Sequence, residues 1–170
     1  LGIEKGTYAA ITLHRPSNVD DPEKFAEILT AFERIENDLQ LIFPMHPRTR
    51  HNIKGTAFEK RIDAMANMRL IDPIGYLDFL KLMSNARLVM TDSGGIQEET
   101  TILGVPCMTL RDNTERPVTV TEGTNRLITP ITSSNILTHY NEIMTNGTVQ
   151  GRIPKFWDGQ AAQRIAEIIR

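Results

Sequence analysis

The chain has 170 residues, of which 40% are hydrophobic and 24% are charged, and its formal net charge is -2. This composition is typical of a folded domain large enough to bury a core, and the small charge argues against nucleic acid as a partner. No apolar stretch approaches membrane-spanning length, and the single cysteine, Cys107, cannot form an internal disulfide, so we expect a cytoplasmic protein.

Strands and helices are predicted to alternate through the first half of the chain. After a linker remnant at residues 1–6, an apolar strand is expected at 8–13, and Asp20 or Asp21 then caps a helix. Apolar residues recur at helical spacing through this helix, which should therefore face the core. Further along we expect a strand at 41–44, a weakly patterned helix at about 50–66, a strand at 68–71 and a short helix at 76–84.

The second half continues the alternation. An apolar strand at 86–90 leads into Gly94 and Gly95, and the helix that follows stops at Gly104, before Pro106. Beyond it we expect a strand at 107–110, a loop through 113–117 and a strand at 126–128. A helix at about 135–145 should be capped by Ser133 or Ser134 and ended by Asn146-Gly147. A last helix is expected at 160–170, capped by Asp158. This alternation predicts an α/β fold, a doubly wound parallel sheet.

The turn after the strand at 86–90 has the features of a phosphate site. Gly94 and Gly95 open a helix, so free backbone N–H groups and the positive end of the helix dipole point to one place, beside the hydroxyl of Ser93. Glu98 and Glu99 follow, and one of these carboxylates could accept hydrogen bonds from a ribose, but their spacing does not decide which. A tight strand-to-helix turn without a ligand would use the same glycines.

Polar residues follow other predicted strands as well. His14 and Arg15 come after the first strand, His46 after the second, and Arg116 beyond the strand at 107–110. The carboxyl ends of parallel strands meet at one edge of the sheet, and open α/β sheets bind their ligands there. Histidines and arginines near a phosphate-shaped turn suit a nucleotide diphosphate, although each residue alone is also compatible with a surface or capping role.

Other chemistries are disfavoured by the spacing of the residues. The histidines are dispersed and no acidic pair has calcium or magnesium spacing, so we expect no metal site. The turn lacks the Gly-x-Gly-x-x-Gly of NAD-binding proteins, and Ser93 is not in the Gly-x-Ser-x-Gly of hydrolases. We therefore expect no cofactor, and neither nucleic acid nor a membrane as a partner.

Three segments together resemble the non-hydrolysing UDP-N-acetylglucosamine (UDP-GlcNAc) 2-epimerase family: DSGGIQEE at 92–99, LGVPCMTLRDNTERP at 103–117 and EGTNRLI at 122–128. The resemblance covers nearly the whole chain and implies the C-terminal half of such an enzyme. Family members have two Rossmann-type domains that face a cleft, the GT-B arrangement. Residues 1–170 would then be a single Rossmann-like UDP-binding domain, with residues 158–170 as its C-terminal helix.

The resemblance also implies how the substrate is bound. The diphosphate would be contacted by Ser93, Gly94 and Gly95. Glu99 would hold the ribose, and Arg116 would contact the nucleotide sugar. Phe79 and the backbone near Ile74 would border the uracil.

The same resemblance gives His14 a catalytic role, because the matching family residue lies beside the phosphates and assists the departure of UDP. Arg15 and His46 match positions that help to bind a second, activating UDP-GlcNAc in bacterial relatives. The family usually has His-Arg-Arg-Glu-Asn where this chain has Pro-Ser at 16–17, and His-Pro-Asn where this chain has Arg48. Both departures lie near the implied regulatory site.

The implied reaction inverts C2 of the sugar and interconverts UDP-GlcNAc and UDP-N-acetylmannosamine (UDP-ManNAc). UDP is eliminated to leave a 2-acetamidoglucal and is then added back. The residues that move the C2 proton belong to the N-terminal domain, which is the missing partner, so this half alone is expected to be inactive. The resemblance further implies a homodimeric full-length isomerase in cell-envelope polysaccharide biosynthesis. The alternatives are the nucleotide-binding domain of a GT-B glycosyltransferase, a hydrolysing variant that releases N-acetylmannosamine, and a non-enzymatic nucleotide-sugar sensor.

Overall fold

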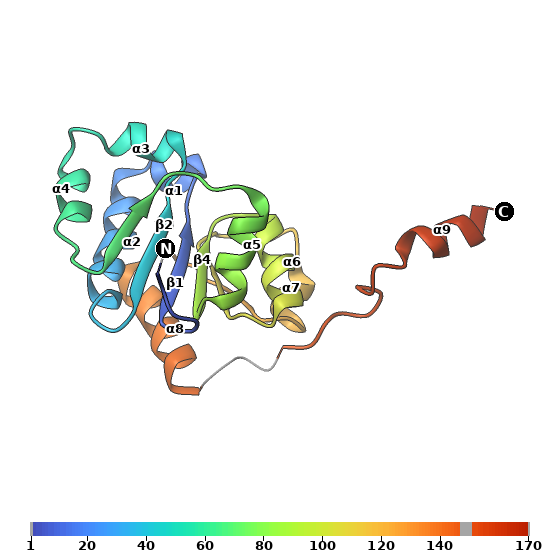
Figure 1. Ribbon diagram of the computed structural model, residues 1–170. Helices are drawn as coiled ribbons and strands as arrows, with labels where there is room; N and C mark the ends of the chain where they lie inside the picture. Colours follow the sequence, from blue (N-terminus) through green and yellow to red (C-terminus); the bar gives the residue numbers. More distant parts are fainter. Residues whose placement is uncertain (1, 147–150, 170) are drawn as a thin grey trace.

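The computed structural model describes residues 2–146 and 151–169, and within them the strands form one six-stranded parallel sheet (Figure 1). The strands are β1 (Tyr8–Thr12), β2 (Gln40–Pro44), β3 (Met68–Ile71), β4 (Leu88–Thr91), β5 (Cys107–Thr109) and β6 (Asn125–Leu127). Their order across the sheet is β3-β2-β1-β4-β5-β6. This is the order of a Rossmann-type doubly wound sheet, and it confirms the predicted fold class. The direction of winding reverses between β1 and β4.

Helices cover both faces of the sheet. They are α1 (Pro16–Val19), α2 (Pro22–Ile35), α3 (Pro47–Ile53), α4 (Ala57–Asp63), α5 (Tyr76–Asn85), α6 (Gly94–Leu103), α7 (Pro117–Thr121), α8 (Ser133–Asn146) and α9 (Ala161–Ile169). Helices α2 and α8 lie against one face, and α5 and α6 lie against the other (Figure 1).

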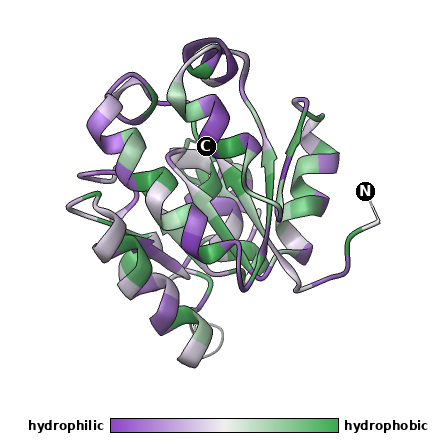
Figure 2. Cartoon of the chain, turned by 90° about the vertical axis from the view of Figure 1, so that its left-hand side faces the viewer, coloured by the Kyte–Doolittle hydropathy of each residue, from purple (hydrophilic) through white to green (hydrophobic). Residues whose placement is uncertain are grey.

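The alternation of side chains along each strand builds a separate core on each face. In β1, Ala9 and Ile11 belong to the core shared with α2 and α8, whereas Tyr8 and Ala10 belong to the core shared with α5. Figure 2 shows the hydrophobic residues gathered on the central strands and on the inward sides of the helices. With both faces buried, the strands hold their loops in fixed positions at the carboxyl edge.

One predicted helix is in fact two. The expected helix at 50–66 is divided into α3 and α4 by Gly55, whose φ of 73° is in the left-handed region that favours glycine. Thr56 then starts the second helix, because its side chain accepts a hydrogen bond from the backbone N–H of Phe58. The weak apolar pattern of this stretch did not reveal the break.

Other helix boundaries are settled by their caps. Asp21, rather than Asp20, caps α2 by accepting from the backbone N–H groups of Glu23 and Lys24. The prediction of Ser133 or Ser134 as the cap of α8 is wrong, because the hydroxyl of Thr132 accepts from the N–H of Asn135 at 3.3 Å. The helix therefore begins at Ser133, earlier than predicted, and it ends at Asn146; Gly147 lies outside the described residues.

Two short helices were not predicted. Helix α1 follows Arg15 and α7 follows Arg116, and each has a proline in its first turn. Neither is long enough to show helical periodicity in the sequence. Both lie directly beyond loops that carry candidate site residues, so each helix holds the end of such a loop in position.

Helix α9 projects away from the sheet (Figure 1). None of its residues is buried, and Ile168 is 85% exposed. The predicted cap, Asp158, lies before the helix rather than at its cap position, because α9 begins at Ala161; its carboxylate accepts from the N–H of Gln160 at 3.1 Å. The segment before it is attached to the body, since the backbone N–H of Arg152 donates to the carbonyl of Glu122 at 2.7 Å.

Candidate functional site

The glycine turn lies between β4 and α6, at the carboxyl edge of the sheet. Ser93 is the N-cap residue of α6, but its side chain makes no capping hydrogen bond. A Cβ built on Gly95 would meet nothing within 4 Å, so the space beside the turn is open. Gly104 ends the helix in the left-handed conformation, with a φ of 68°. The start of α6 is therefore open, as the predicted phosphate site requires.

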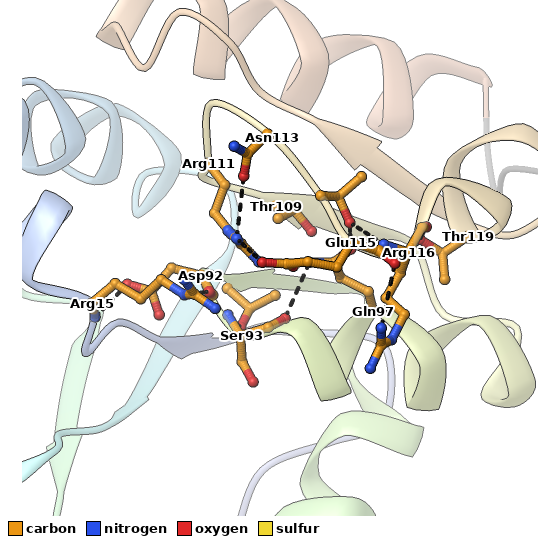
Figure 3. A network of polar contacts seen from close by, with 12 residues as sticks. Arg15, Asp92, Ser93, Gln97, Thr109, Arg111, Asn113, Glu115, Arg116 and Thr119 are labelled. Atoms are coloured by element: carbon orange, nitrogen blue, oxygen red, sulfur yellow. Dashed lines mark hydrogen bonds and ion pairs between the residues drawn. The ribbon is translucent and has the colours of Figure 1, made fainter.

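Asp92 joins this turn to the loop after β1. Its carboxylate is fully buried and accepts hydrogen bonds from the backbone N–H groups of His14, at 3.1 Å, and Arg15, at 2.9 Å. The Nδ2 group of Asn18 donates to the same carboxylate at 3.2 Å. The side chain of Arg15 donates from Nε to the carbonyl of Asp92 at 2.8 Å (Figure 3). Asp92 was not a candidate in the sequence, although a charged residue directly after a buried strand was a signal for one.

His14 contacts the same carboxylate through its ring. Its Nδ1 lies 3.0 Å from Oδ1 of Asp92, and its side chain is 40% exposed. The hydrogen bond to Asp92 raises the pKa of His14 above its ordinary value, against partial burial and the nearby charge of Arg15, which lower it. The structure thus places this predicted residue next to the glycine turn, with its charged form favoured.

A small hollow lies on the other side of His14. It has a volume of about 170 Å³ and is lined by Thr12, His14, Pro44, His46, Pro73, Ile74 and Phe79. The rings of His14 and His46 are 5.9 Å apart between centroids. The Nδ1 of His46 accepts from the N–H of Arg48 at 3.2 Å and caps α3. The candidates from the loops after β1, β2 and β3 therefore meet in one place.

Glu98 and Glu99 have different partners. The carboxylate of Glu98 forms an ion pair with Arg116, with 2.8 Å between Oε1 and Nε. Burial raises the pKa of Glu99, a hydrogen bond with Tyr76 lowers it, and the neighbouring charge of Glu98 raises it. Arg116 thus lies against α6, and the fourth predicted loop joins the site.

Sequence reasoning missed a buried arginine at this site. Arg111 is only 7% exposed, and both of its terminal nitrogens lie 2.7 Å from the carboxylate oxygens of Glu115 (Figure 3). A Cβ on Gly94 would lie 3.9 Å from each partner of this pair. The pairing lowers the pKa of Glu115 to about 2. Only the tertiary fold brings this pair to the start of α6.

The loop that carries the pair is fixed by Gln97, a fully buried residue of α6. Its Oε1 accepts from the hydroxyl of Thr114 at 2.6 Å and from Nδ2 of Asn125 at 3.2 Å.

Among residues 2–146 and 151–169, no group of three or more His, Cys, Asp or Glu could hold a metal ion. No helix in the described part of the chain is long and apolar enough to cross a membrane.

The sheet order and the open helix start at its carboxyl edge define a Rossmann-like α/β domain of the kind that forms one half of GT-B proteins. The family model for UDP-N-acetylglucosamine 2-epimerase matches residues 2–170, so the chain belongs to this family. This match confirms the resemblance seen in the motifs.

Individual relatives agree with the family match. The chain is 43% identical over 164 residues to a UDP-N-acetylglucosamine 2-epimerase of Methanocaldococcus jannaschii, covering 95% of this chain and 44% of the relative. It is 36% identical over 159 residues to the UDP-2,3-diacetamido-2,3-dideoxy-D-glucuronate 2-epimerase of Pseudomonas aeruginosa, covering 93% and 43% of the two chains.

A crystal structure of the M. jannaschii UDP-GlcNAc 2-epimerase in complex with UDP-GlcNAc and UDP superposes on this chain with a TM-score of 0.85 and 41% identity. The match covers 97% of this chain and 45% of that one. The chain thus spans about half the length of the relatives it matches.

Proposed function

We propose that this chain is the UDP-binding half of a UDP-GlcNAc 2-epimerase, an isomerase that interconverts UDP-GlcNAc and UDP-ManNAc. The observation that carries the proposal is the open start of α6, joined through Asp92 to a histidine whose charged form is favoured. Family membership and the UDP-GlcNAc and UDP complex of the M. jannaschii relative support the choice of ligand.

In this proposal the diphosphate binds at the start of α6, contacting Ser93, Gly94 and Gly95. Glu99 accepts hydrogen bonds from the ribose, because Glu98 is already paired with Arg116. Arg116 contacts the sugar end of the nucleotide. Phe79 borders the uracil beside Ile74, and both residues line the hollow next to His14.

His14 acts on the departing phosphate. When the bond between C1 of the sugar and the β-phosphate oxygen breaks, the electron pair stays on that oxygen and negative charge develops there. A protonated His14 beside the phosphates stabilises this charge and assists the departure of UDP. Residues of the N-terminal half remove the C2 proton as UDP leaves, which gives the 2-acetamidoglucal. When UDP adds back to C1, a proton is returned to the opposite face of C2, and this gives the epimer.

The proposal extends to regulation and assembly. Arg15 follows His14 in the chain, the ring of His46 lies 5.9 Å from that of His14, and both residues are candidates for holding a second, activating UDP-GlcNAc. The full-length enzyme is proposed to be a homodimer in the cytoplasm, acting without a cofactor in cell-envelope polysaccharide biosynthesis. The single buried thiol of Cys107 is compatible with a reducing compartment. The family match favours an epimerase over a GT-B glycosyltransferase or a nucleotide-sugar sensor.

UDP binding by the chain itself tests the proposal. In a chemical-shift titration of labelled protein, UDP should give saturable shifts centred on residues 93–96, with a dissociation constant on the order of 0.1–1 mM, because no second domain closes over the ligand. Uridine should bind much more weakly, since it offers no anion to the helix start. Equal responses to UDP and uridine, or shifts at the opposite edge of the sheet, would contradict the proposal.

Activity gives a second test. Incubation of this chain with UDP-GlcNAc should give no UDP-ManNAc by NMR, because the C2 proton donor and acceptor are expected in the N-terminal half. The chain joined to that half should give the epimer, and the release of free N-acetylmannosamine would instead identify a hydrolysing variant. Product formation by the 170-residue chain, above that of a vector-purified control, would mean that it carries its own proton-transfer groups.

A further inference from the structure

We propose that Asp92 is a positioning residue for His14: its buried carboxylate holds Nδ1 of the ring and leaves Nε2 as the nitrogen that can reach the departing phosphate. The inference rests on the proposed function for the identity of the ligand. The contact between the two side chains is independent of any ligand.

The geometry around Asp92 is that of a fixed acceptor. Its side chain has no exposed surface and belongs to the segment between β4 and α6, so it cannot move without disturbing the glycine turn. Three donors besides the ring point at the carboxylate, namely the N–H groups of His14 and Arg15 and the Nδ2 of Asn18. These hydrogen bonds satisfy the carboxylate oxygens and lock their orientation.

The charge of the Asp92 carboxylate is compensated by one direct contact and by a more distant cation, because Arg111 acts on it through space. Within the described residues, the ion-pair partner of its oxygens is the ring of His14, since Arg15 donates from its side chain to the backbone carbonyl of Asp92 instead. A buried carboxylate is costly unless it is paired, so Asp92 stabilises the protonated ring, and the protonated ring stabilises Asp92.

The groups that face His14 oppose one another. Asp92 favours the charged ring, whereas Arg15, on the same loop, disfavours it, and His46 lies across the hollow from the loop after β2. Because Asp92 makes direct contact at 3.0 Å, its influence exceeds that of the cation, which acts only through space.

The consequence for the reaction is a defined proton position. With Nδ1–H donated to Asp92, the neutral ring has a free lone pair on Nε2, and the protonated ring has a proton there. As the C1–O bond breaks, the Nε2 proton is donated to the β-phosphate oxygen that keeps the electron pair. In the reverse step Nε2 takes the proton back.

The first test follows the ring of His14 by NMR in the free chain. In the wild type, spectra of the ring nitrogens at high pH should show the neutral tautomer with the proton on Nδ1. In Asp92→Asn the His14 titration should move to lower pH, because an amide accepts a hydrogen bond but carries no charge. The control is Asp20→Asn, which makes the same substitution at a carboxylate that pairs with Arg48 and not with the ring, and it should leave the titration unchanged.

Some results would overturn the inference. A wild-type ring with its neutral proton on Nε2 would do so, and it needs no variant, so the inference remains testable even if Asp92→Asn fails to fold. The same holds for an Asp92→Asn variant that is folded and titrates like the wild type. Absence of UDP binding would refute the proposed function but would leave these two measurements standing.

The second test uses the chain joined to its N-terminal half. Asp92→Asn should lower kcat by at least about tenfold with little change in KM, because the ring still contacts the phosphates but is less often protonated. The limb of the pH profile that reports His14 should move to lower pH. A fall in kcat with an unmoved pH profile would indicate a merely structural role for Asp92.

Discussion

Glu98 and Glu99 are adjacent in the sequence but differ in what they are free to do. Glu98 is paired with Arg116, whereas Glu99 is partly buried against Tyr76, and burial raises its pKa. A carboxylate that already pairs with an arginine has less to offer a ribose, so the fold supports Glu99 as the ribose ligand, a choice that sequence spacing could not make.

Substitution of each glutamate tests this choice. Glu99→Ala should weaken UDP binding by roughly ten- to a hundredfold, because loss of a charged hydrogen-bond partner usually costs about 1.5–3 kcal/mol. Glu98→Ala, the matched control, should have little effect on UDP. Calorimetry on the two folded variants measures both affinities, and the reverse order would assign the ribose to Glu98.

Gly95 should show a conflict between stability and binding. A Cβ at this position meets no protein atom within 4 Å, so Gly95→Ala should stabilise the free protein, by about 0.5 kcal/mol for a glycine near a helix end. The added methyl occupies the space proposed for the diphosphate, and UDP affinity should fall by about tenfold or more.

Thermal melts and UDP titrations of the same samples measure both effects of Gly95→Ala. Ile102→Ala is the control, because this exposed residue lies at the other end of α6 and should leave UDP binding unchanged. A Gly95→Ala variant that binds UDP as well as the wild type would show that the diphosphate does not approach this turn.

At the scale of elements, α9 contrasts with the helices that build the core. It has an apolar side but no buried residue, and its Arg164 forms an ion pair with Asp158, which is close by in the chain. Isolated helices of this length are marginal in water, so tertiary packing is normally needed to hold them. The preceding segment differs, because Pro154 is buried and the backbone of Gly151 packs closely on Gly123.

Truncation should separate these two segments. A chain that ends at Gly159 should melt at the same temperature as the full 170 residues, because no buried contact is lost. A chain that ends at Asn146 should melt at a lower temperature, since it also loses the hydrogen bond between Arg152 and Glu122. Calorimetric melting measures both, and a clear drop for the first truncation would show that α9 packs on the sheet domain in solution.

At the scale of the whole molecule, the site is a meeting of four loops at one edge of the sheet. Parallel strands place the ends of β1, β2, β4 and β5 along that edge, and charged contacts join the loops. Because several of these contacts involve titratable groups, the stability of the fold should depend on pH through the site itself.

Two groups give this dependence opposite signs. The pKa of Glu115 falls from 4.5 to about 2 on folding, so its contribution to stability is present above pH 4.5 and is lost as the pH falls towards 2. The pKa of His14 is raised above 6.5, so its contribution is full below pH 6.5 and is lost as the pH rises through the folded value.

Urea unfolding of Glu115→Gln and His14→Gln against the wild type, from acid to alkaline pH, measures both contributions. The stability difference for Glu115→Gln should shrink in acid, and that for His14→Gln should shrink in alkali. Differences that are constant over the whole range would show that neither ion pair forms in the folded protein.

Much of this protein follows from the sequence alone. Apolar strands alternating with helical patterns determine the doubly wound sheet, because side-chain periodicity decides which faces can be buried. The glycine turn and the residues after each strand are likewise local signals, and the motif order identifies the family. Local signals failed where helices were short or weakly patterned, as at Gly55, α1 and α7.

Only the tertiary structure decided which side chains of the site contact one another. The contacts of Asp92 with His14 and of Arg116 with Glu98 each join residues from different segments of the chain, and nothing in the sequence indicates which residues pair. Arg111 and Glu115 are close in sequence, but their position at the start of α6 depends on the loop that Gln97 holds. Such pairings depend on the strand order, which places distant loops side by side, and on burial, which makes an unpaired charge costly.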